Sequence, residues 1–489
     1  MSTVPQPDAA AQPIVLLGVP FDNVTAAQTV ELIEQMVASR QPHHLVAANV
    51  GFLVQALSDI ELHRILTDAH LVLADERPLV WASRLLGNPL PRPVAGADLV
   101  PLLLQVAARR KYRVFFLGGT PESTADACAK LRARHPDLIV AGSYAPPGAP
   151  LLEMDHEDIC RRIKQAGPDL LFVSFGCPKE EKWIAMHYRS LGVPIAVGVG
   201  AAMEAVRGRV RGEPGRHWGR AARNLAVFAL AIAQQWWRIQ LRQVHAPAGA
   251  VTQAALRPRN NWQRIRMPAR LDGAAARRDR ASCEAALADG RYCLLDLSNV
   301  VYIDSTGAGL LLALRQRARL SHRKVILLSP SPAARAALRW MRLEGLFTVA
   351  ADMAAAAELM ENPAPARPVL ARPNYFPWRP SVFWQGEITA ANVEQVWRST
   401  QSQIAARAKA GSRFLIDLSA LKFIDSAGAW LMLRARESGL QQGLEIVFTG
   451  VQPEVSNVLH FARAESVLPQ PGGIPGLGRR RRHRRASVD

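Results

Sequence analysis

The chain has 489 residues, more than a single hydrophobic core usually holds, so we expect two to four domains. Its hydrophobic content of 49% and charged content of 21% are ordinary for a folded soluble protein. The formal net charge of +19 favours acidic partners, either nucleic acid or an anionic membrane surface. Because nothing in the sequence resembles a nucleic-acid-binding fold, we expect the membrane surface and no nucleic acid.

The cysteines and the apolar segments indicate the compartment. The five cysteines (128, 160, 177, 283 and 293) are odd in number and form no Cys-x-x-Cys pair, which is typical of a reducing compartment. The first residues lack the basic and apolar regions of a signal peptide. The longest apolar stretch, Leu225–Ala233, is shorter than the ~20 residues that cross a bilayer. We therefore expect a cytoplasmic protein that associates peripherally with the inner face of the cell membrane.

Predicted strands and helices alternate through the first half of the chain. Residues 1–13 are expected to be a flexible tail, and the alternation extends from Ile14 to about His245. The predicted strands are 44–48, 71–74, 113–117, 138–141, 170–175 and 195–199, with helices such as 26–38 and 123–134 between them. This alternation predicts an α/β domain with a parallel sheet and helices on both faces.

Polar residues follow two of these strands directly. Asn49 comes after the strand 44–48 and Asp75 after the strand 71–74. Parallel sheets bind ligands at the carboxyl ends of their strands. A carboxylate placed there can accept a proton from an attacking hydroxyl group. The alternative is that Asp75 caps the helix that follows it.

Two further strand ends suggest a site for a phosphorylated substrate. Gly118 and Gly119 form a strand-to-helix turn of the phosphate-binding type, with free backbone N–H groups. The strand 170–175 is followed by a loop that carries Lys179 and Lys182 beside Glu180 and Glu181. No metal-binding motif is present, so we expect cationic side chains rather than a metal or another cofactor to neutralise a diphosphate.

Five motifs in this order resemble the WecG/TagA/CpsF family of glycosyltransferases. They are Ala48-Asn-Val50, Ala74-Asp75 with Pro78–Trp81, Val94–Leu99, Phe116–Gly119 and Phe175–Trp183. The resemblance covers about residues 14–245. It implies a Rossmann-like fold and inverting, metal-independent transfer from a UDP-sugar to a polyprenyl-diphosphate-linked acceptor in cell-surface polysaccharide biosynthesis. The sugar would be N-acetylmannosamine, its uronic acid or another hexose.

The resemblance also assigns roles to particular residues. It makes Asp75 the catalytic base and Asn49 its partner. The expected substrate-binding residues are Arg92, Asp98, Gly118, Gly119, Lys179, Glu180, Glu181, Lys182 and Arg211. Relatives carry glutamine at the position of Glu180, so we expect this residue to place a negative charge near the diphosphate, opposed by Lys179 or Arg211. A catalytically degenerate scaffold that only binds a sugar nucleotide is the alternative.

A basic stretch with aromatic residues ends this half of the chain. It contains Arg207, Arg209, Arg211, Arg216, Arg220 and Arg223, then Leu225–Ala233 and Trp236-Trp237-Arg238. Arginines can bind lipid head groups and an acceptor diphosphate, and tryptophans favour the membrane interface. Ordinary packing of a helix against the domain is the alternative reading.

The second half of the chain contains a duplication. The segment Leu294–Leu312 recurs as Leu415–Leu433 at a constant offset of 121 residues, which indicates one small domain present twice. Residues 246–262 and 363–373 are predicted linkers, and residues 469–489 are predicted to be a disordered basic tail. Each copy places Asp-Ser, 304–305 or 425–426, between a strand and a helix, where the serine could cap the helix and Gly307 or Gly428 could permit a tight turn.

The repeated pattern resembles the STAS domain of anti-sigma-factor antagonists, over residues 263–362 and 374–468. The resemblance implies two small α/β domains, phosphorylation of Ser305 and Ser426 by an external anti-sigma-type kinase, or docking to another STAS-binding protein. Thr306 and Gly309 in the first copy correspond to Ala427 and Trp430 in the second. We therefore expect the copies to bind different partners or each other, which leaves homo-oligomerisation open, and to regulate or localise the transferase.

Overall fold

The computed structural model describes residues 11–87, 89–94, 96–200, 218–240, 262–288, 292–321, 323–361, 382–406 and 413–468. The chain forms two compact units, Met1–Ala366 and Arg367–Asp489. The first unit contains the N-terminal domain and the first copy of the duplicated segment, called repeat 1. The second unit contains the other copy, called repeat 2.

The N-terminal domain is built on the parallel sheet that the sequence predicts. In the described residues its six strands are β3 (His43–Ala48), β4 (Leu71–Ala74), β5 (Arg113–Gly118), β6 (Ile139–Tyr144), β7 (Leu170–Ser174) and β8 (Ile195–Gly198). Their order in the sheet is β4-β3-β8-β7-β5-β6, and every neighbouring pair is parallel. The α/β fold class is therefore confirmed.

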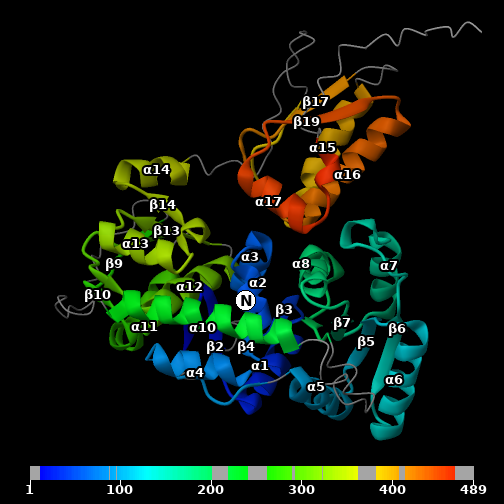
Figure 1. The fold of residues 1–489 in the computed structure, drawn as a ribbon, viewed down its shortest axis with the longest axis horizontal. Coiled ribbons are helices and arrows are strands. Elements are labelled where there is room, and N and C mark those ends of the chain that lie inside the picture. The colour runs from blue at the N-terminus through cyan, green and yellow to red at the C-terminus, as the bar shows by residue number, and fades with distance from the viewer. Residues whose placement is uncertain are drawn as a thin grey trace, which may run out of the picture. The chain divides into compact units, whose positions relative to one another are not determined.

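Helices cover both faces of this sheet (Figure 1). They are α1 (Ala26–Ser39), α2 (Val50–Ala56), α3 (Ile60–Asp68), α4 (Arg77–Leu85), α5 (Gly96–Arg110), α6 (Pro121–Arg134), η1 (Leu151–Glu153), α7 (His156–Ala166), α8 (Lys179–Leu191) and α10 (Trp218–Gln240). Successive strand residues point to opposite faces. Leu71 and Leu73 accordingly join one hydrophobic cluster, whereas Val72 joins the other. The sheet thus lies between two cores.

Local sequence signals fix several of these helix ends. Thr25 begins α1 with a capping box, in which its hydroxyl accepts from the Gln28 N–H and the Gln28 side chain accepts from the Thr25 N–H. Thr120 and Ser123 form the same arrangement at the start of α6. Gly167 and Gly192 follow α7 and α8 in left-handed conformations, as helix C-termini favour.

An antiparallel hairpin of β1 (Ala11–Leu16) and β2 (Val19–Asn23) precedes the sheet. It corrects the predicted tail of residues 1–13, because β1 begins at Ala11. This hairpin was not predicted from the sequence. Its strands are short, and the packing of Ile14 and Leu16 into the core of the domain supplies the stabilisation that two isolated strands lack.

Repeat 1 combines a small parallel sheet with four helices in its described residues. The sheet has the order β14 (Thr348–Ala350), β13 (Lys324–Leu328), β11 (Tyr292–Asp296), β9 (Trp262–Arg266), and β10 (Arg270–Leu271) pairs with β12 (Tyr302–Ile303). The helical segments are α11 (Gly273–Ala288), α12 (Ser305–Leu320), α13 (Pro332–Trp340), η3 (Glu344–Leu346) and α14 (Met353–Glu361).

Repeat 2 has the corresponding elements. They are β15 (Val382–Phe383), β16 (Gly386–Ile388), α15 (Val393–Ala406), β17 (Arg413–Asp417), β18 (Leu421–Ile424), α16 (Ser426–Gln441), β19 (Glu445–Thr449), α17 (Pro453–Phe461) and η4 (Glu465–Val467). Its strands pair in parallel as β15-β17-β19 and β16-β18. Trp384 is fully buried in its core, and the indole N–H donates to Thr400 Oγ1 at 3.1 Å.

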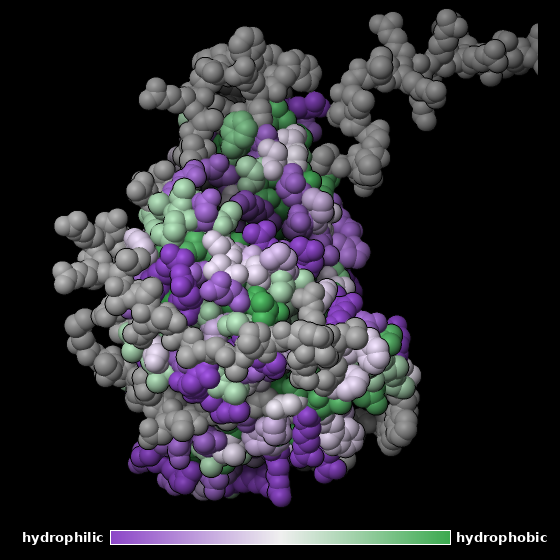
Figure 2. Space-filling view, turned by 90° about the vertical axis from the view of Figure 1, so that its left-hand side faces the viewer, coloured by the Kyte–Doolittle hydropathy of each residue, from purple (hydrophilic) through white to green (hydrophobic). Residues whose placement is uncertain are grey.

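None of the helices in the described residues combines the length and the hydrophobicity that a bilayer crossing requires. Figure 2 shows the molecule from the side on which α11, α13 and α14 lie in Figure 1. Hydrophilic residues are spread over this face, and hydrophobic residues form only small groups among them.

Candidate active site

Asn49 and Asp75 lie side by side at the carboxyl edge of the sheet. They directly follow Ala48 and Ala74, which are paired in register on the neighbouring strands β3 and β4. The Asp75 N–H donates to the Ala48 carbonyl at 2.9 Å. Both side chains are half-buried. The sequence prediction that the two residues share one edge therefore agrees with the structure.

The carboxylate of Asp75 is held by the start of another helix. Its Oδ1 accepts a hydrogen bond of 2.6 Å from the N–H of Gly96, the first residue of α5. The helix that directly follows Asp75 is α4, and its N-cap residue is Glu76, whose side chain makes no capping hydrogen bond there. The alternative that Asp75 caps the next helix is thus wrong. Its carboxylate joins the end of β4 to α5.

Asn49 is the N-cap residue of helix α2. Two side chains that were not predicted from the sequence, those of Glu76 and Asn224, lie near it. Its Oδ1 accepts from the Phe52 N–H at 3.0 Å, and Glu76 Oε2 accepts from the Val50 N–H at 3.3 Å. Because Gly51 has no side chain, Asn224 of α10 can come close to Asn49. A Cβ atom at this glycine would lie 3.0 Å from Asn49 Oδ1 and 3.6 Å from Asn224 Nδ2 of α10. Helix α10 therefore reaches the site edge, which only tertiary packing reveals.

The carboxylate of Glu180 is buried and accepts hydrogen bonds from three backbone N–H groups. Its Oε2 accepts from the N–H groups of Phe175, Gly176 and Gly200 at 3.2, 3.0 and 3.2 Å. The residue is 3% exposed, and burial raises its pKa to about 7 although these hydrogen bonds lower it. The expectation that Glu180 faces a bound diphosphate is corrected, because its carboxylate turns inward and ties the end of β7 to the end of β8.

Glu181 and Lys182 are also buried. Burial and the neighbouring Glu180 raise the pKa of Glu181 well above its usual value. Lys182 Nζ pairs with Asp59 Oδ2 at 2.8 Å and with Glu61 Oε2 at 2.9 Å. Burial lowers the pKa of Lys182, but the two carboxylates outweigh burial and the net shift is upward. Both predicted substrate contacts are corrected, because Lys182 ties α8 to the start of α3 and Glu181 packs against Gly198 of β8.

Lys179 stays at the edge of the sheet. Its ammonium lies 5.2 Å from the centre of the Phe175 ring and donates to the Ala149 carbonyl. Desolvation lowers its pKa. Arg92 and Asp98 are both exposed, with Asp98 in the first turn of α5. Arg211 lies outside the described residues.

The Gly118-Gly119 turn requires glycine. The φ angles are +110° and +78°, and a Cβ atom at Gly118 would lie 2.2 Å from the Ser174 carbonyl oxygen. The turn therefore brings the ends of β5 and β7 together. Its N–H groups are less free than predicted, because that of Gly119 donates to Ser174 O at 3.3 Å and that of Thr120 to Ser123 Oγ at 2.8 Å.

The two repeats share one arrangement at the Asp-Ser pair. Asp304 caps α12, because its Oδ1 accepts from the Thr306 and Gly307 N–H groups at 2.8 Å each. Asp425 caps α16 through the Gly428 N–H at 3.0 Å. The serine-cap prediction is thus corrected: Ser305 and Ser426 are the first helical residues, and both are fully buried.

The glycines that follow these serines serve a close approach rather than a turn. A Cβ atom at Gly307 would lie 1.9 Å from the Leu271 carbonyl oxygen, and one at Gly428 would lie 2.8 Å from that of Ile388. Each glycine thereby lets the first turn of its helix contact the neighbouring short strand, which corrects the tight-turn prediction.

Comparison with known proteins identifies the families that the chain matches. Residues 14–212 match the glycosyl transferase WecG/TagA/CpsF family, and residues 257–356 and 381–470 match the STAS domain. The chain is 31% identical over 201 residues to the N-acetylglucosaminyldiphosphoundecaprenol N-acetyl-beta-D-mannosaminyltransferase of Staphylococcus aureus strain NCTC 8325 / PS 47. The match spans 41% of this chain and 77% of that relative. The chain belongs to the WecG/TagA/CpsF glycosyltransferase family.

Two further matches are a protein from another staphylococcal strain and a solved structure. The protein of the same name from Staphylococcus aureus strain MRSA252 is 30% identical over 201 residues, 41% of this chain and 77% of that protein. Among solved structures, the unphosphorylated anti-sigma factor antagonist SpoIIAA is 22% identical with a TM-score of 0.19, covering 24% of this chain and 97% of that structure. The N-terminal domain of this WecG/TagA/CpsF protein is called the transferase domain below, and repeats 1 and 2 are called STAS1 and STAS2.

Proposed function

We propose that the chain is an inverting, metal-independent glycosyltransferase of cell-surface polysaccharide biosynthesis. It would move a sugar from a UDP-sugar to a polyprenyl-diphosphate-linked acceptor. The observation that carries this proposal is the pairing of Asn49 and Asp75 at adjacent strand ends, with Asp75 Oδ1 fixed by the Gly96 N–H. The name of the staphylococcal relative, an N-acetylmannosaminyltransferase acting on a diphosphoundecaprenol-linked sugar, supports the same donor and acceptor classes.

In the proposed reaction Asp75 acts as the general base. Its carboxylate accepts the proton of the acceptor hydroxyl while the hydroxyl oxygen forms a bond to the anomeric carbon of the donor. The bond between that carbon and the diphosphate oxygen breaks, and UDP leaves with the electron pair. Attack on the face opposite UDP inverts the configuration. Asn49, on the neighbouring strand, is proposed to orient the reacting sugar.

The proposed counter-charge for the diphosphate comes from the outer rim of the site. Lys179 lies at this edge, and Arg92 and Arg211 remain candidates by resemblance. Glu180 does not compete for the diphosphate as an exposed carboxylate would, since three backbone N–H groups hold it inside. This geometry favours an active enzyme over a catalytically degenerate scaffold, which the sequence left as the alternative.

Helix α10 is proposed to lie on the anionic inner face of the membrane. Leu225, Leu230 and Trp237 are 47%, 64% and 59% exposed, although they are large apolar residues. Arg220 and Arg223 are exposed near the beginning of the same helix. Exposed apolar and basic side chains on one helix are typical of interfacial binding. The STAS domains are proposed to regulate or localise the enzyme through a kinase or another STAS-binding protein.

The direct test is a transfer assay with full-length protein. UDP-N-acetylmannosamine, its uronic acid form and other UDP-hexoses are offered with a polyprenyl-diphosphate-linked N-acetylglucosamine acceptor. The expected result is a lipid-linked disaccharide whose new linkage has the configuration inverted from the donor, as NMR reports. Tight UDP binding without product from any donor would instead establish the scaffold.

A further inference from the structure

Strand β1 belongs to two hydrophobic cores at once. Ile14 and Leu16 are fully buried in the core of the transferase domain. Val15 points to the other side of the strand and is fully buried in the core of STAS1. STAS1 therefore covers an apolar surface that the transferase domain would otherwise expose to water.

Helix α12 of STAS1 makes this contact, and Gly309 permits it. A Cβ atom at Gly309 would lie 2.2 Å from the Pro13 carbonyl oxygen, a separation that real atoms do not adopt. The position that corresponds to Gly309 in STAS2 is Trp430. An indole there would overlap the backbone of β1, so STAS2 cannot cover the hairpin in the same way.

The contact between STAS1 and the transferase domain is called the joint below. In it, a single buried glutamine connects three elements. Gln235 of α10 donates from Nε2 to Ser305 Oγ at 2.9 Å and to the Val15 carbonyl at 3.1 Å. Its Oε1 accepts from the Leu17 N–H at 3.0 Å. Both amide protons of this side chain are thus used. Gln235 thereby links α10 to β1 and to the first residue of α12.

Ion pairs and hydrogen bonds surround the apolar contact. Arg315 pairs with Asp68 at 2.7 Å, and Arg319 pairs with the same carboxylate. Gln316 Nε2 donates to the Ala69 carbonyl at 2.8 Å. Arg315, Gln316 and Arg319 of α12 thus all contact the C-terminal end of α3. The joint therefore has an apolar centre and a charged rim, as specific protein interfaces do.

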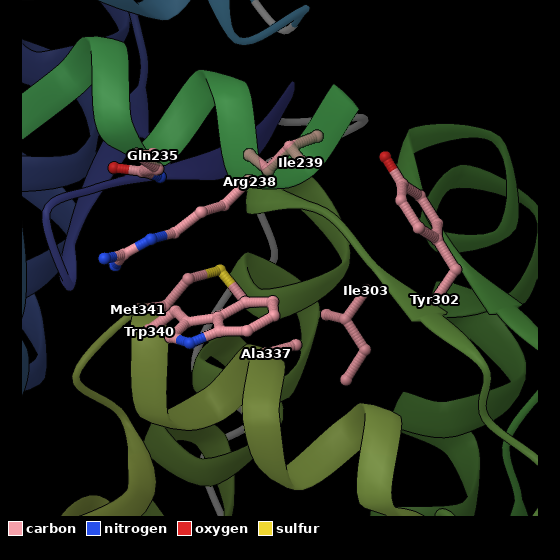
Figure 3. Close-up of a pocket in the computed structure, with 8 residues that line it drawn as sticks. All are labelled: Gln235, Arg238, Ile239, Tyr302, Ile303, Ala337, Trp340 and Met341. Atoms are coloured by element: carbon pink, nitrogen blue, oxygen red, sulfur yellow. The ribbon is translucent and has the colours of Figure 1, made fainter. Parts of the chain in front are cut away.

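A small pocket lies between the C-terminal end of α10 and STAS1. Figure 3 shows Arg238 extending from α10 over Trp340 and Met341 of STAS1, and the guanidinium carbon lies 5.9 Å from the centre of the Trp340 ring.

We propose that STAS1 is an intramolecular clamp that fixes the C-terminal end of α10, and that STAS2 cannot replace it. The clamp builds on the proposed function, since α10 is the helix whose exposed side is proposed to meet the membrane. STAS1 holds Gln235 and Arg238, which flank the exposed Trp237. Ser305 is fully buried and its hydroxyl oxygen accepts a hydrogen bond from Gln235, so this serine is not accessible to a kinase while STAS1 is docked.

The test compares variants of the full-length protein by hydrogen exchange and by binding to vesicles. Gly309→Trp copies the STAS2 residue into STAS1, and Trp430→Gly is the matched control in STAS2. Asp68→Arg opposes Arg315 and Arg319 without altering STAS1, so it opens the joint even where Gly309→Trp disturbs the fold of STAS1. Exchange is followed in β1 and in residues 232–240, and binding is measured with vesicles that contain phosphatidylglycerol.

The clamp predicts faster exchange in both segments for Gly309→Trp and Asp68→Arg but not for Trp430→Gly. It also predicts vesicle binding weaker by about tenfold for the two opened variants, because side chains that STAS1 had ordered must then be ordered on binding. Unchanged exchange in both variants would overturn the clamp. Faster exchange with unchanged vesicle binding would overturn its role at the membrane while the transfer activity stands. A wild-type protein that does not bind these vesicles would overturn the membrane part of the proposed function itself.

Discussion

Replacing Glu180 by glutamine tests whether this residue is a buried acceptor of backbone hydrogen bonds or a ligand of the donor. The carboxylate is 3% exposed and accepts from three backbone N–H groups that join the ends of β7 and β8. Glutamine keeps a carbonyl oxygen that can accept these bonds, and it removes a negative charge from a buried place beside Glu181. We therefore expect Glu180→Gln to change stability in a pH-dependent way.

The size and sign of the effect follow from the pKa of Glu180. Burial raises it from 4.5 to about 7. Between these pH values the unfolded chain has lost the proton that the folded chain retains, so unfolding releases a proton and the stability of the wild type falls as the pH rises. At 1.36 kcal/mol per pH unit, the wild type loses about 3 kcal/mol between pH 4.5 and pH 7 through this group. The glutamine variant has no such proton to lose.

Calorimetric unfolding at pH 5 and pH 8 measures this difference. Relative to the wild type, Glu180→Gln should gain roughly 5 °C or more in Tm at pH 8 beyond any change at pH 5. Glu157→Gln, an exposed glutamate of α7, is the matched control and should follow the wild type at both pH values. If the Tm difference between Glu180→Gln and the wild type is the same at both pH values, the buried position of the Glu180 carboxylate is refuted.

Two further predictions concern buried charges. Lys182→Met leaves two buried carboxylates without their ammonium partner, so the free energy of unfolding in urea should fall by about 3–5 kcal/mol, and a loss below about 1 kcal/mol would contradict the buried pairing. Burial raises the pKa of Asp68, but its two arginine partners outweigh burial and lower it from 3.8 to about 2. The stabilisation from this carboxylate should therefore be complete above about pH 4 and decline as the pH falls toward 2. The Tm difference between the wild type and Asp68→Asn should shrink at pH 3. An undiminished difference would count against the ion pair.

The positions of the catalytic candidates could be predicted from the sequence. Buried strands give continuous apolar runs, and the polar residue that ends each run marks the carboxyl edge of the sheet. Asn49 and Asp75 were found in this way, and the structure places them on adjacent strands. Strand position is a local property of the chain, which is why this part of the prediction succeeded.

The roles of the charged residues in the α8 segment could not be predicted. Glu180, Glu181 and Lys182 all follow a strand end, as ligand-binding residues do. Whether such a side chain faces a cleft or the interior depends on what packs against it, and the partners of Lys182 lie on α3, far away in the sequence. The same limit applies to the joint with STAS1. The sequence shows that Gly309 and Trp430 differ, but only the packing of β1 explains the difference.

The most direct test of the central claim compares the transfer rates of the wild type and of Asp75→Asn with UDP-sugar and lipid-linked acceptor. Asparagine has nearly the same shape but is not a base, so we expect a fall of roughly a hundredfold or more in the transfer rate, with UDP binding retained. An Asp75→Asn enzyme that transfers sugar as fast as the wild type would contradict the assignment of Asp75 as the base, and with it the account of this site.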